Sequence, residues 1–101
     1  MKIEFIPREK QRSEYDWADI STKGVRIGKA RCLIDGATLT IYSINIYPEF
    51  AGKGFGRRFV DYCKSRFTTV IADRVRPTAV GFWETMGFAD AHDGSWVYSA
   101  R

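Results

Sequence analysis

The sequence is poor in cysteine and proline and contains a single histidine, His92. Its two cysteines, Cys32 and Cys63, lack the spacing of metal ligands, so we expect no metal site and two small buried thiols in a reduced cytoplasm. Apolar runs of signal-peptide or membrane-span length are also lacking, as are repeats and low-complexity tracts. We therefore predict a soluble, cytoplasmic chain without membrane contact.

Blocks of like charge are absent too. The 16 basic and 12 acidic residues give a formal net charge of +4, and the basic residues are scattered. This balance suits a polyanionic small ligand and a nucleic acid equally well. Nucleic-acid binding has no further support, because no strand interleaves aromatic side chains with Lys or Arg, and we rank it last.

The length of 101 residues and a hydrophobic content of 45% predict one folded domain over residues 1–101. Alternating apolar residues predict strands over residues 1–7, 38–47 and 68–72. A weaker alternation over residues 17–34 has Gly24 and Gly28 at turn or bulge positions. Residues 8–16 are polar and predict a loop or a short surface helix, and Asp35-Gly36 predicts a hairpin turn.

Two helices are predicted from apolar residues at helical spacing. The first runs from about Gly54 to Arg66, and the second begins at Pro77 and ends at Gly87. Residues 88–91 and 95–99 predict a closing hairpin across the turn at residues 92–94. This order implies a parallel strand pair with a helical crossover inside an otherwise antiparallel sheet, which is a mixed α/β fold.

The stretch from Ile44 to Arg58 contains a strand end, a turn, glycines at alternate positions and the start of a helix. Backbone amides at a helix start attract anions, and glycine lets the backbone approach them closely. The spacing fits neither a Walker loop nor a dinucleotide fingerprint. Taken alone, the loop is either a phosphate site or a tight connection without a ligand.

Two segments carry a resemblance to a known family. Residues 47–58 (YPEFAGKGFGRR) resemble the acyl-CoA pyrophosphate loop of the GNAT N-acetyltransferases, usually Arg/Gln-x-x-Gly-x-Gly/Ala. Residues 79–88 (AVGFWETMGF) resemble the Ala-x-x-Phe-Tyr-Glu-x-x-Gly-Phe helix end of the same family. The resemblance extends over residues 39–99 and implies a splayed, mostly antiparallel sheet flanked by helices.

The resemblance also implies a cofactor site. In the family, backbone groups at the strand end meet the pantetheine arm of acetyl-CoA, and loop amides hold its pyrophosphate. Here the strand-end positions are Ile44, Asn45 and Ile46. The loop positions are Gly52, Lys53, Gly54, Phe55, Gly56 and Arg57.

The activity implied is transfer of an acetyl group from acetyl-CoA to an amine by direct attack in a ternary complex. The acceptor is unidentified. The chain is short before its central strands, where family members have helices beside the acceptor, and an open site would suit a protein or peptide amine. Assembly into a homo-oligomer stays open.

Four positions depart from the family pattern. Ala51 replaces the Arg or Gln near the pyrophosphate, and Arg76 replaces a frequent asparagine at the pantetheine. Trp83 replaces the tyrosine that protonates the departing thiolate, and Thr40 replaces a strand glutamate used as a base in some members. These departures support an alternative function, a catalytically weak acyl-CoA-binding module that senses the cofactor or regulates a partner.

Substitutes for the missing acid and base are Tyr47, Tyr98, Asp73, Glu84 and His92. For His92 the alternative is a turn residue, as its Ala-His-Asp-Gly context suggests. Tyr42 and Trp96 are interpreted as sheet packing. We expect a backbone N–H at a strand bulge, near Ile46, to stabilise the oxyanion.

Overall fold

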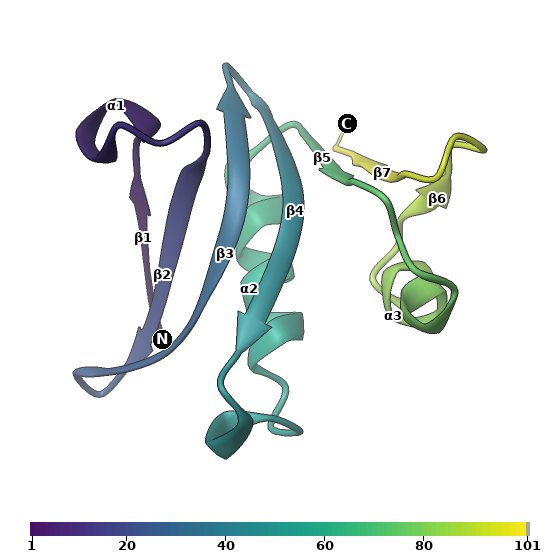
Figure 1. Ribbon diagram of the computed structural model, residues 1–101. Coiled ribbons are helices and arrows are strands. Elements are labelled where there is room, and N and C mark those ends of the chain that lie inside the picture. Colours follow the sequence, from purple (N-terminus) through teal and green to yellow (C-terminus); the bar gives the residue numbers. More distant parts are fainter. Residues whose placement is uncertain (101) are drawn as a thin grey trace.

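Seven strands form one mixed sheet in the computed structural model, which describes residues 1–100, so Arg101 of the predicted domain lies outside it. The order across the sheet is β1-β2-β3-β4-β5-β7-β6 (Figure 1). Their bounds are β1 Lys2–Ile6, β2 Asp16–Thr22, β3 Val25–Asp35, β4 Thr38–Ile46, β5 Thr69–Ala72, β6 Ala89–Asp90 and β7 Trp96–Ser99. Within residues 1–100, β4 and β5 form the one parallel pair, which confirms the predicted mixed fold.

The helices occupy the predicted segments. Their bounds are α1 Arg8–Gln11, α2 Phe55–Arg66 and α3 Val80–Thr85, with 3-10 turns η1 at Pro48–Phe50 and η2 at Pro77–Ala79. Helix α2 is the crossover between the parallel strands β4 and β5, and Gly87, with φ at 88°, follows the end of α3. Within residues 1–100, no helix is both long and apolar enough to cross a membrane.

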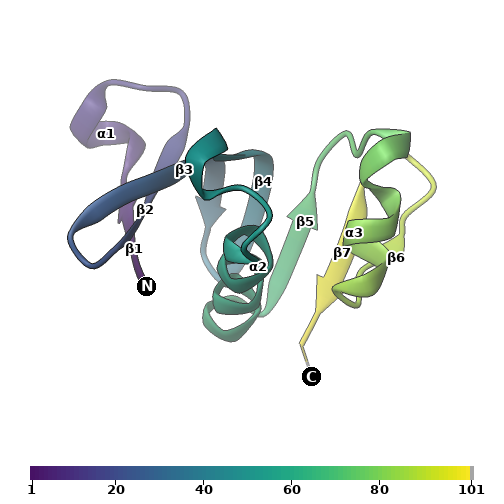
Figure 2. The ribbon, with the colours of Figure 1, turned by 90° about the horizontal axis from the view of Figure 1, so that it is seen from below.

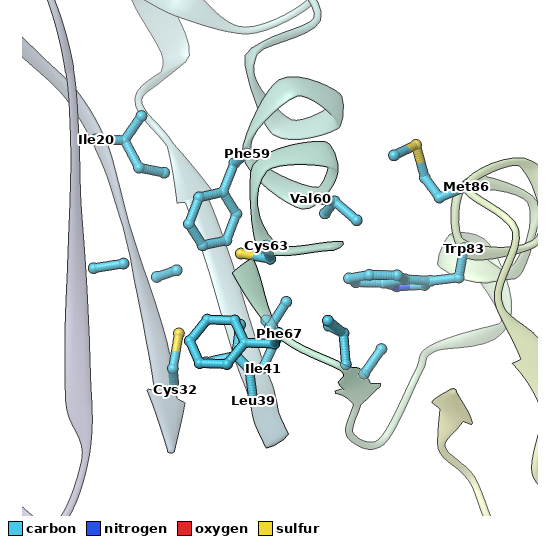
Figure 3. Close-up of a cluster of buried hydrophobic side chains, with 14 of the residues drawn as sticks. Ile20, Cys32, Leu39, Ile41, Phe59, Val60, Cys63, Phe67, Trp83 and Met86 are labelled. Atoms are coloured by element: carbon cyan, nitrogen blue, oxygen red, sulfur yellow. The ribbon is translucent and has the colours of Figure 1, made fainter. Parts of the chain in front are cut away.

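The core lies between one face of the sheet and the helices α2 and α3. Phe59, Val60 and Cys63 of α2 are fully buried, and Trp83 of α3 is 8% exposed. Figure 3 shows Phe59 directed toward β2 and β3, and Val60 directed toward Trp83. This packing matches the apolar spacing from which both helices were predicted.

Both cysteines belong to this core. Cys32 and Cys63 are free thiols with no exposed surface. Burial raises the pKa of Cys63 to about 12, and burial also raises the pKa of Cys32. They behave as small apolar residues, as the sequence predicts.

Strand β4 contains a bulge that the apolar pattern explains. Leu39 and Ile41 face the core at the usual spacing of two, but the next apolar residue is Ile44, three positions later. The register with β3 shifts at this point, which leaves Tyr42 as the extra residue. Because a bulge reverses the alternation of side chains, Ile44 and Ile46 stay on the same face as Ile41.

The same strand separates from its parallel neighbour. Pairing between β4 and β5 ends at Ile41 and Ala72, while β4 continues for five more residues, through Ile46. In Figure 1 the arrowhead end of β4 points away from β5. Figure 2 shows the two resulting groups. Strands β1 to β4 lie with α2, and strands β5, β7 and β6 lie with α3. The sheet is splayed, as expected.

Turns and close approaches lie near the predicted positions. The hairpin between β3 and β4 turns at residues 36–37, one residue beyond the predicted Asp35-Gly36 pair. Gly28 of β3 pairs with Ile46 of β4, and a Cβ there would come within 2.5 Å of the Asn45 carbonyl oxygen. No other residue fits at this position without a shift of the strand.

Asp16 has a structural role that the sequence did not reveal. It is 4% exposed and begins β2, although it ends the polar segment expected to be a loop or surface helix. Its carboxylate accepts hydrogen bonds from the amides of Arg8 and Ile34, both at 2.7 Å. It therefore ties α1 to the end of β3, where β2 no longer supplies a partner strand.

Candidate functional site

A cavity of about 540 Å³ lies where β4 and β5 separate. Its walls are the second half of β4, the residues after β5, and the facing sides of α2 and α3. Apolar side chains from these walls include Ile44, Ile46, Ala79, Phe82 and Trp83. The volume is in the range of pockets that bind small molecules.

Two residues of β4 turn unpaired backbone groups toward this cavity. The amide of Tyr47 donates to the Ile27 carbonyl at 2.9 Å, which directs the backbone of Tyr47 toward β3. The register with β3 is regular from there back to the bulge, and backbone groups of an antiparallel strand alternate in direction. The amides and carbonyls of Ile44 and Ile46 therefore point toward β5, and no strand of residues 1–100 pairs with them.

The alternation changes the contribution expected from Asn45. Its backbone groups point toward β3, where they pair with Lys29, and its side chain is exposed. Asn45 does not line the cavity described for residues 1–100, whereas Ile44 and Ile46 do. Its predicted backbone contact with the cofactor is not available in this register.

The predicted position of the bulge was wrong. The bulge lies at Tyr42 and not near Ile46, because Ile46 is in regular register with Gly28. The spacing of three between Ile41 and Ile44 is the signal that sequence analysis missed. The alternation directs the backbone of Ser43 toward β3, so the first amide after the bulge that faces the cavity is that of Ile44.

The glycine loop leads from β4 into α2, whose Gly56 lines the cavity. Gly52 and Gly54 have φ of 76° and 82°, a conformation that most side chains disfavour, and a Cβ at either position would meet no atom within 4 Å. Gly54 is the N-cap of α2 and supplies no side-chain cap. The loop thus leaves open space beside its backbone.

Helix α2 presents its first amides to that space. In the first turn of an α-helix the N–H groups have no partner within the helix, so those of Phe55, Gly56 and Arg57 are free to bind a ligand. Gly56 lines the cavity, and the side chains of Arg57 and Arg58 are exposed. Since cations at a helix start are unfavourable alone, an anion bound here would offset them.

Comparisons with known proteins agree with this geometry. No protein-family model matches the chain. An uncharacterized N-acetyltransferase of Oceanobacillus iheyensis is 39% identical over 54 residues, which is 54% of this chain and 33% of that protein. The match thus spans about a third of the length of that relative.

Solved structures cover more of the chain. The N-acetyltransferase YlbP of Bacillus subtilis, in complex with coenzyme A, has a TM-score of 0.64 at 16% identity, over 84% of this chain and 70% of that one. A Bacteroides thetaiotaomicron structure assigned to the GNAT family has a TM-score of 0.69 at 14% identity, over 98% of this chain and 73% of that one.

The chain has the GNAT acetyltransferase fold. The resemblance inferred from its two sequence motifs is confirmed.

Trp83, which the resemblance places at the position of the family's acid, is a packed core residue. Its indole contacts Phe82 and Phe88 edge-on, with centroids 5.0 and 4.9 Å apart, and it also lines the cavity. An indole N–H donates a hydrogen bond but does not supply a proton at ordinary pH. Trp83 can therefore shape the cavity without acting as a general acid.

Asp73 is the acidic candidate that the structure brings to the cavity. It directly follows β5, and its amide donates to the Ile41 carbonyl at 3.0 Å, which fixes it beside the bulge at Tyr42. Its side chain is 32% exposed and lies 3.6 Å from Arg74. A carboxylate in this place can accept a proton directly or through water.

The other four candidate side chains do not line this cavity in the described residues. Tyr98 of β7 packs on Phe88, with the Lys64 ammonium 4.6 Å from its ring centroid. Glu84 is exposed on α3, and Tyr47 follows β4. His92, with φ at 63°, lies in the β6–β7 turn, where its amide donates to Asp90 at 2.8 Å, so the turn alternative holds for it.

The remaining departures from the GNAT pattern also have clear positions. Thr40 points to the face of the sheet away from the helices, between Leu33 and Ile71, and does not line the described cavity. Ala51 is exposed just before the glycine loop. Arg76 is exposed and lines the cavity ahead of η2, where its charge is available to an anionic ligand.

Proposed function

We propose that this protein binds acetyl-CoA between β4 and β5 and transfers the acetyl group to an amine. The observation that carries the proposal is that the backbone groups of Ile44 and Ile46 have no partner on the β5 side, in the strand that leads into the open glycine loop. Unpaired backbone groups beside apolar walls suit the amides of a pantetheine arm, which can complete the broken sheet. A cytoplasmic location, expected from the sequence, belongs to the same proposal.

The loop supplies the second half of the fit. The pyrophosphate would lie against the amides of residues 52–57, where the backbone is open and the dipole of α2 favours negative charge. Exposed cations at Lys53, Arg57 and Arg58 surround this position. The missing side chain at Ala51 removes one contact and leaves the backbone contacts in place.

In the proposed reaction a neutral amine attacks the thioester carbonyl carbon. A C–N bond forms and the C–S bond breaks, so that CoA leaves as the thiolate. Asp73 accepts the proton of the amine, directly or through water, and solvent protonates the thiolate because Trp83 does not. The amide of Ile44, which follows the bulge and faces the cavity, would stabilise the oxyanion, and holding both reactants in the cavity supplies much of the acceleration.

A second function is favoured by Trp83. A GNAT fold that keeps the cofactor loop and lacks the usual acid can bind acetyl-CoA with little turnover, as a sensor or a regulator of a partner. Loss of a general acid reduces rates by about 10²–10⁴-fold. The slow enzyme and the sensor therefore share the cofactor site and differ in turnover.

Two measurements separate these functions. Isothermal titration calorimetry at physiological salt is expected to show acetyl-CoA binding, and its absence would refute both. Release of the CoA thiol, followed with a thiol reagent over a panel of small amines and peptides, is expected above the background hydrolysis rate. If acetyl-CoA binds but no amine leads to release of the CoA thiol, the sensor function is favoured over the enzyme.

A further inference from the structure

A cationic and aromatic cluster lies on the face of the sheet away from α2 and α3. It consists of Tyr15, Arg31 and Tyr42, all half-buried. The guanidinium carbon of Arg31 is 4.8 Å from the Tyr15 ring centroid, and the Tyr15 and Tyr42 rings meet edge-on with centroids 5.3 Å apart. Stacking on an aromatic ring holds a guanidinium in a defined orientation.

Arg31 has donors without acceptors in this cluster. Its Nε is buried and makes no hydrogen bond, and the guanidinium forms no ion pair within residues 1–100. Asp19, on the same face, is engaged by Arg26, and Asp73 lies beside Arg74. A buried N–H without an acceptor is costly, and the planar fork of a guanidinium matches the two oxygens of a carboxylate or phosphate.

The cluster adjoins the cavity proposed for acetyl-CoA. Arg31 pairs across the strands with Ser43, and both Ser43 and Tyr42 line the cavity. Asp73 lines the same cavity from the β5 side. An amine that approaches Asp73 from this face of the sheet would therefore carry its neighbouring groups past Tyr42 toward Arg31.

We propose that Arg31, stacked on Tyr15 beside Tyr42, binds an oxyanion carried by the acceptor, so that the substrate is an amine with a nearby carboxylate or phosphate. This inference rests on the proposed acetyl transfer and names its substrate class. The terminal N–H groups of Arg31 would donate to the two oxygens, while the amine faces Asp73. Arg31 thus determines which amines bind.

Paired acceptors test this class. Tyrosine and tyramine differ by a carboxylate, and phosphoethanolamine and ethanolamine differ by a phosphate. We expect the anionic member of at least one pair to be the preferred acceptor. The pair that shows the preference identifies the bound group as a carboxylate or a phosphate. Arg31→Gln should raise the KM of that member about tenfold or more, as for loss of a charge-assisted hydrogen bond, with little change in kcat or in the KM of the uncharged amine.

Lys29→Gln is the matched control. Lys29 lies on the same strand and face, with its ammonium 5.3 Å from the Trp17 ring centroid, and its removal takes one positive charge away without touching the cluster. The KM values of the Lys29→Gln variant should stay at the wild-type level. Equal KM values for both members of each pair, or equal effects of Arg31→Gln and Lys29→Gln, would overturn the proposal.

A second readout does not depend on turnover. Acetate and inorganic phosphate, titrated into the ¹⁵N-labelled wild-type protein, should shift the Arg31 Nε–H resonance in a saturable way. The inference is overturned if neither anion gives a saturable shift. It is also overturned if a single-stranded oligonucleotide shifts the resonance and the two anions do not. Failure of acetyl-CoA to bind in calorimetry would refute the proposed function, and this titration reports on Arg31 independently.

Discussion

Trp83 and Asp73 define what the cavity can do at the level of single residues. Trp83 is held between two phenylalanines and offers no usable proton, whereas Asp73 is fixed by its own amide beside the strand bulge. In the proposed reaction Asp73 is therefore the base, and Trp83 supplies no acid. This imbalance predicts a slow reaction in which departure of the thiolate is the weak step.

Substitution of Trp83 tests that assignment. Trp83→Tyr places a phenol in the same wall of the cavity, and turnover with a good acceptor should rise about tenfold or more, since a positioned acid contributes about 10²–10⁴-fold. Trp83→Phe is the matched control, because it makes a similar loss of volume without a hydroxyl. If the two variants have equal kcat, the thiolate obtains its proton by another route.

Arg31 and Asp16 show two uses of polar groups inside this small chain. The Asp16 carboxylate is satisfied by two amides and holds α1 against the sheet. The Arg31 guanidinium is oriented by an aromatic ring and its Nε has no acceptor among the described residues. The satisfied Asp16 supports the fold, whereas the unsatisfied Arg31, on the strand next to the cavity, is the observation behind the proposed oxyanion site.

At the level of elements, the site depends on how β4 ends. Its first half pairs with β5, the bulge at Tyr42 changes its phase, and its second half leaves β5 while keeping its apolar side chains on the core face. The glycine loop and the first turn of α2 follow directly. One continuous segment, residues 38–58, thus provides both the broken sheet edge and the proposed phosphate site.

Gly54 gives an element-scale test of the phosphate site. Asp and Asn both tolerate positive φ, so Gly54→Asp and Gly54→Asn should each fold. The added carboxylate should weaken acetyl-CoA binding about tenfold or more. Two like charges about 4 Å apart repel by roughly 1 kcal/mol in water and roughly 4 kcal/mol near a protein surface. Gly54→Asn should lose far less in calorimetry. Equal affinities in the two folded variants would contradict the loop assignment.

Across the whole molecule, local signals in the sequence identify most elements. The apolar spacing of α2, the proline and glycine bounding the α3 region, and the hairpin before β4 all depend on neighbouring residues. The two GNAT motifs also lie in continuous segments. Features of this kind can be read from a sequence because their physical causes are short-range.

Features that join distant segments were not predicted. The cluster of Tyr15, Arg31 and Tyr42 combines a loop with two strands, and its formation depends on the register of β3 with β4. The same register directs the backbone groups of Asn45 toward β3. A shift of one residue would reverse every one of these side chains, so their positions follow only from the sheet itself.

Amide hydrogen exchange, measured residue by residue by NMR with and without acetyl-CoA, tests the central claim most directly. If acetyl-CoA fills the gap between β4 and β5, exchange at Ile44 and Ile46 should slow on binding, together with exchange at the first amides of α2. Asn45 is an internal control, because its amide already faces β3 and should not change. Slower exchange at Asn45 with none at Ile44 or Ile46, or no response to acetyl-CoA, would contradict the account.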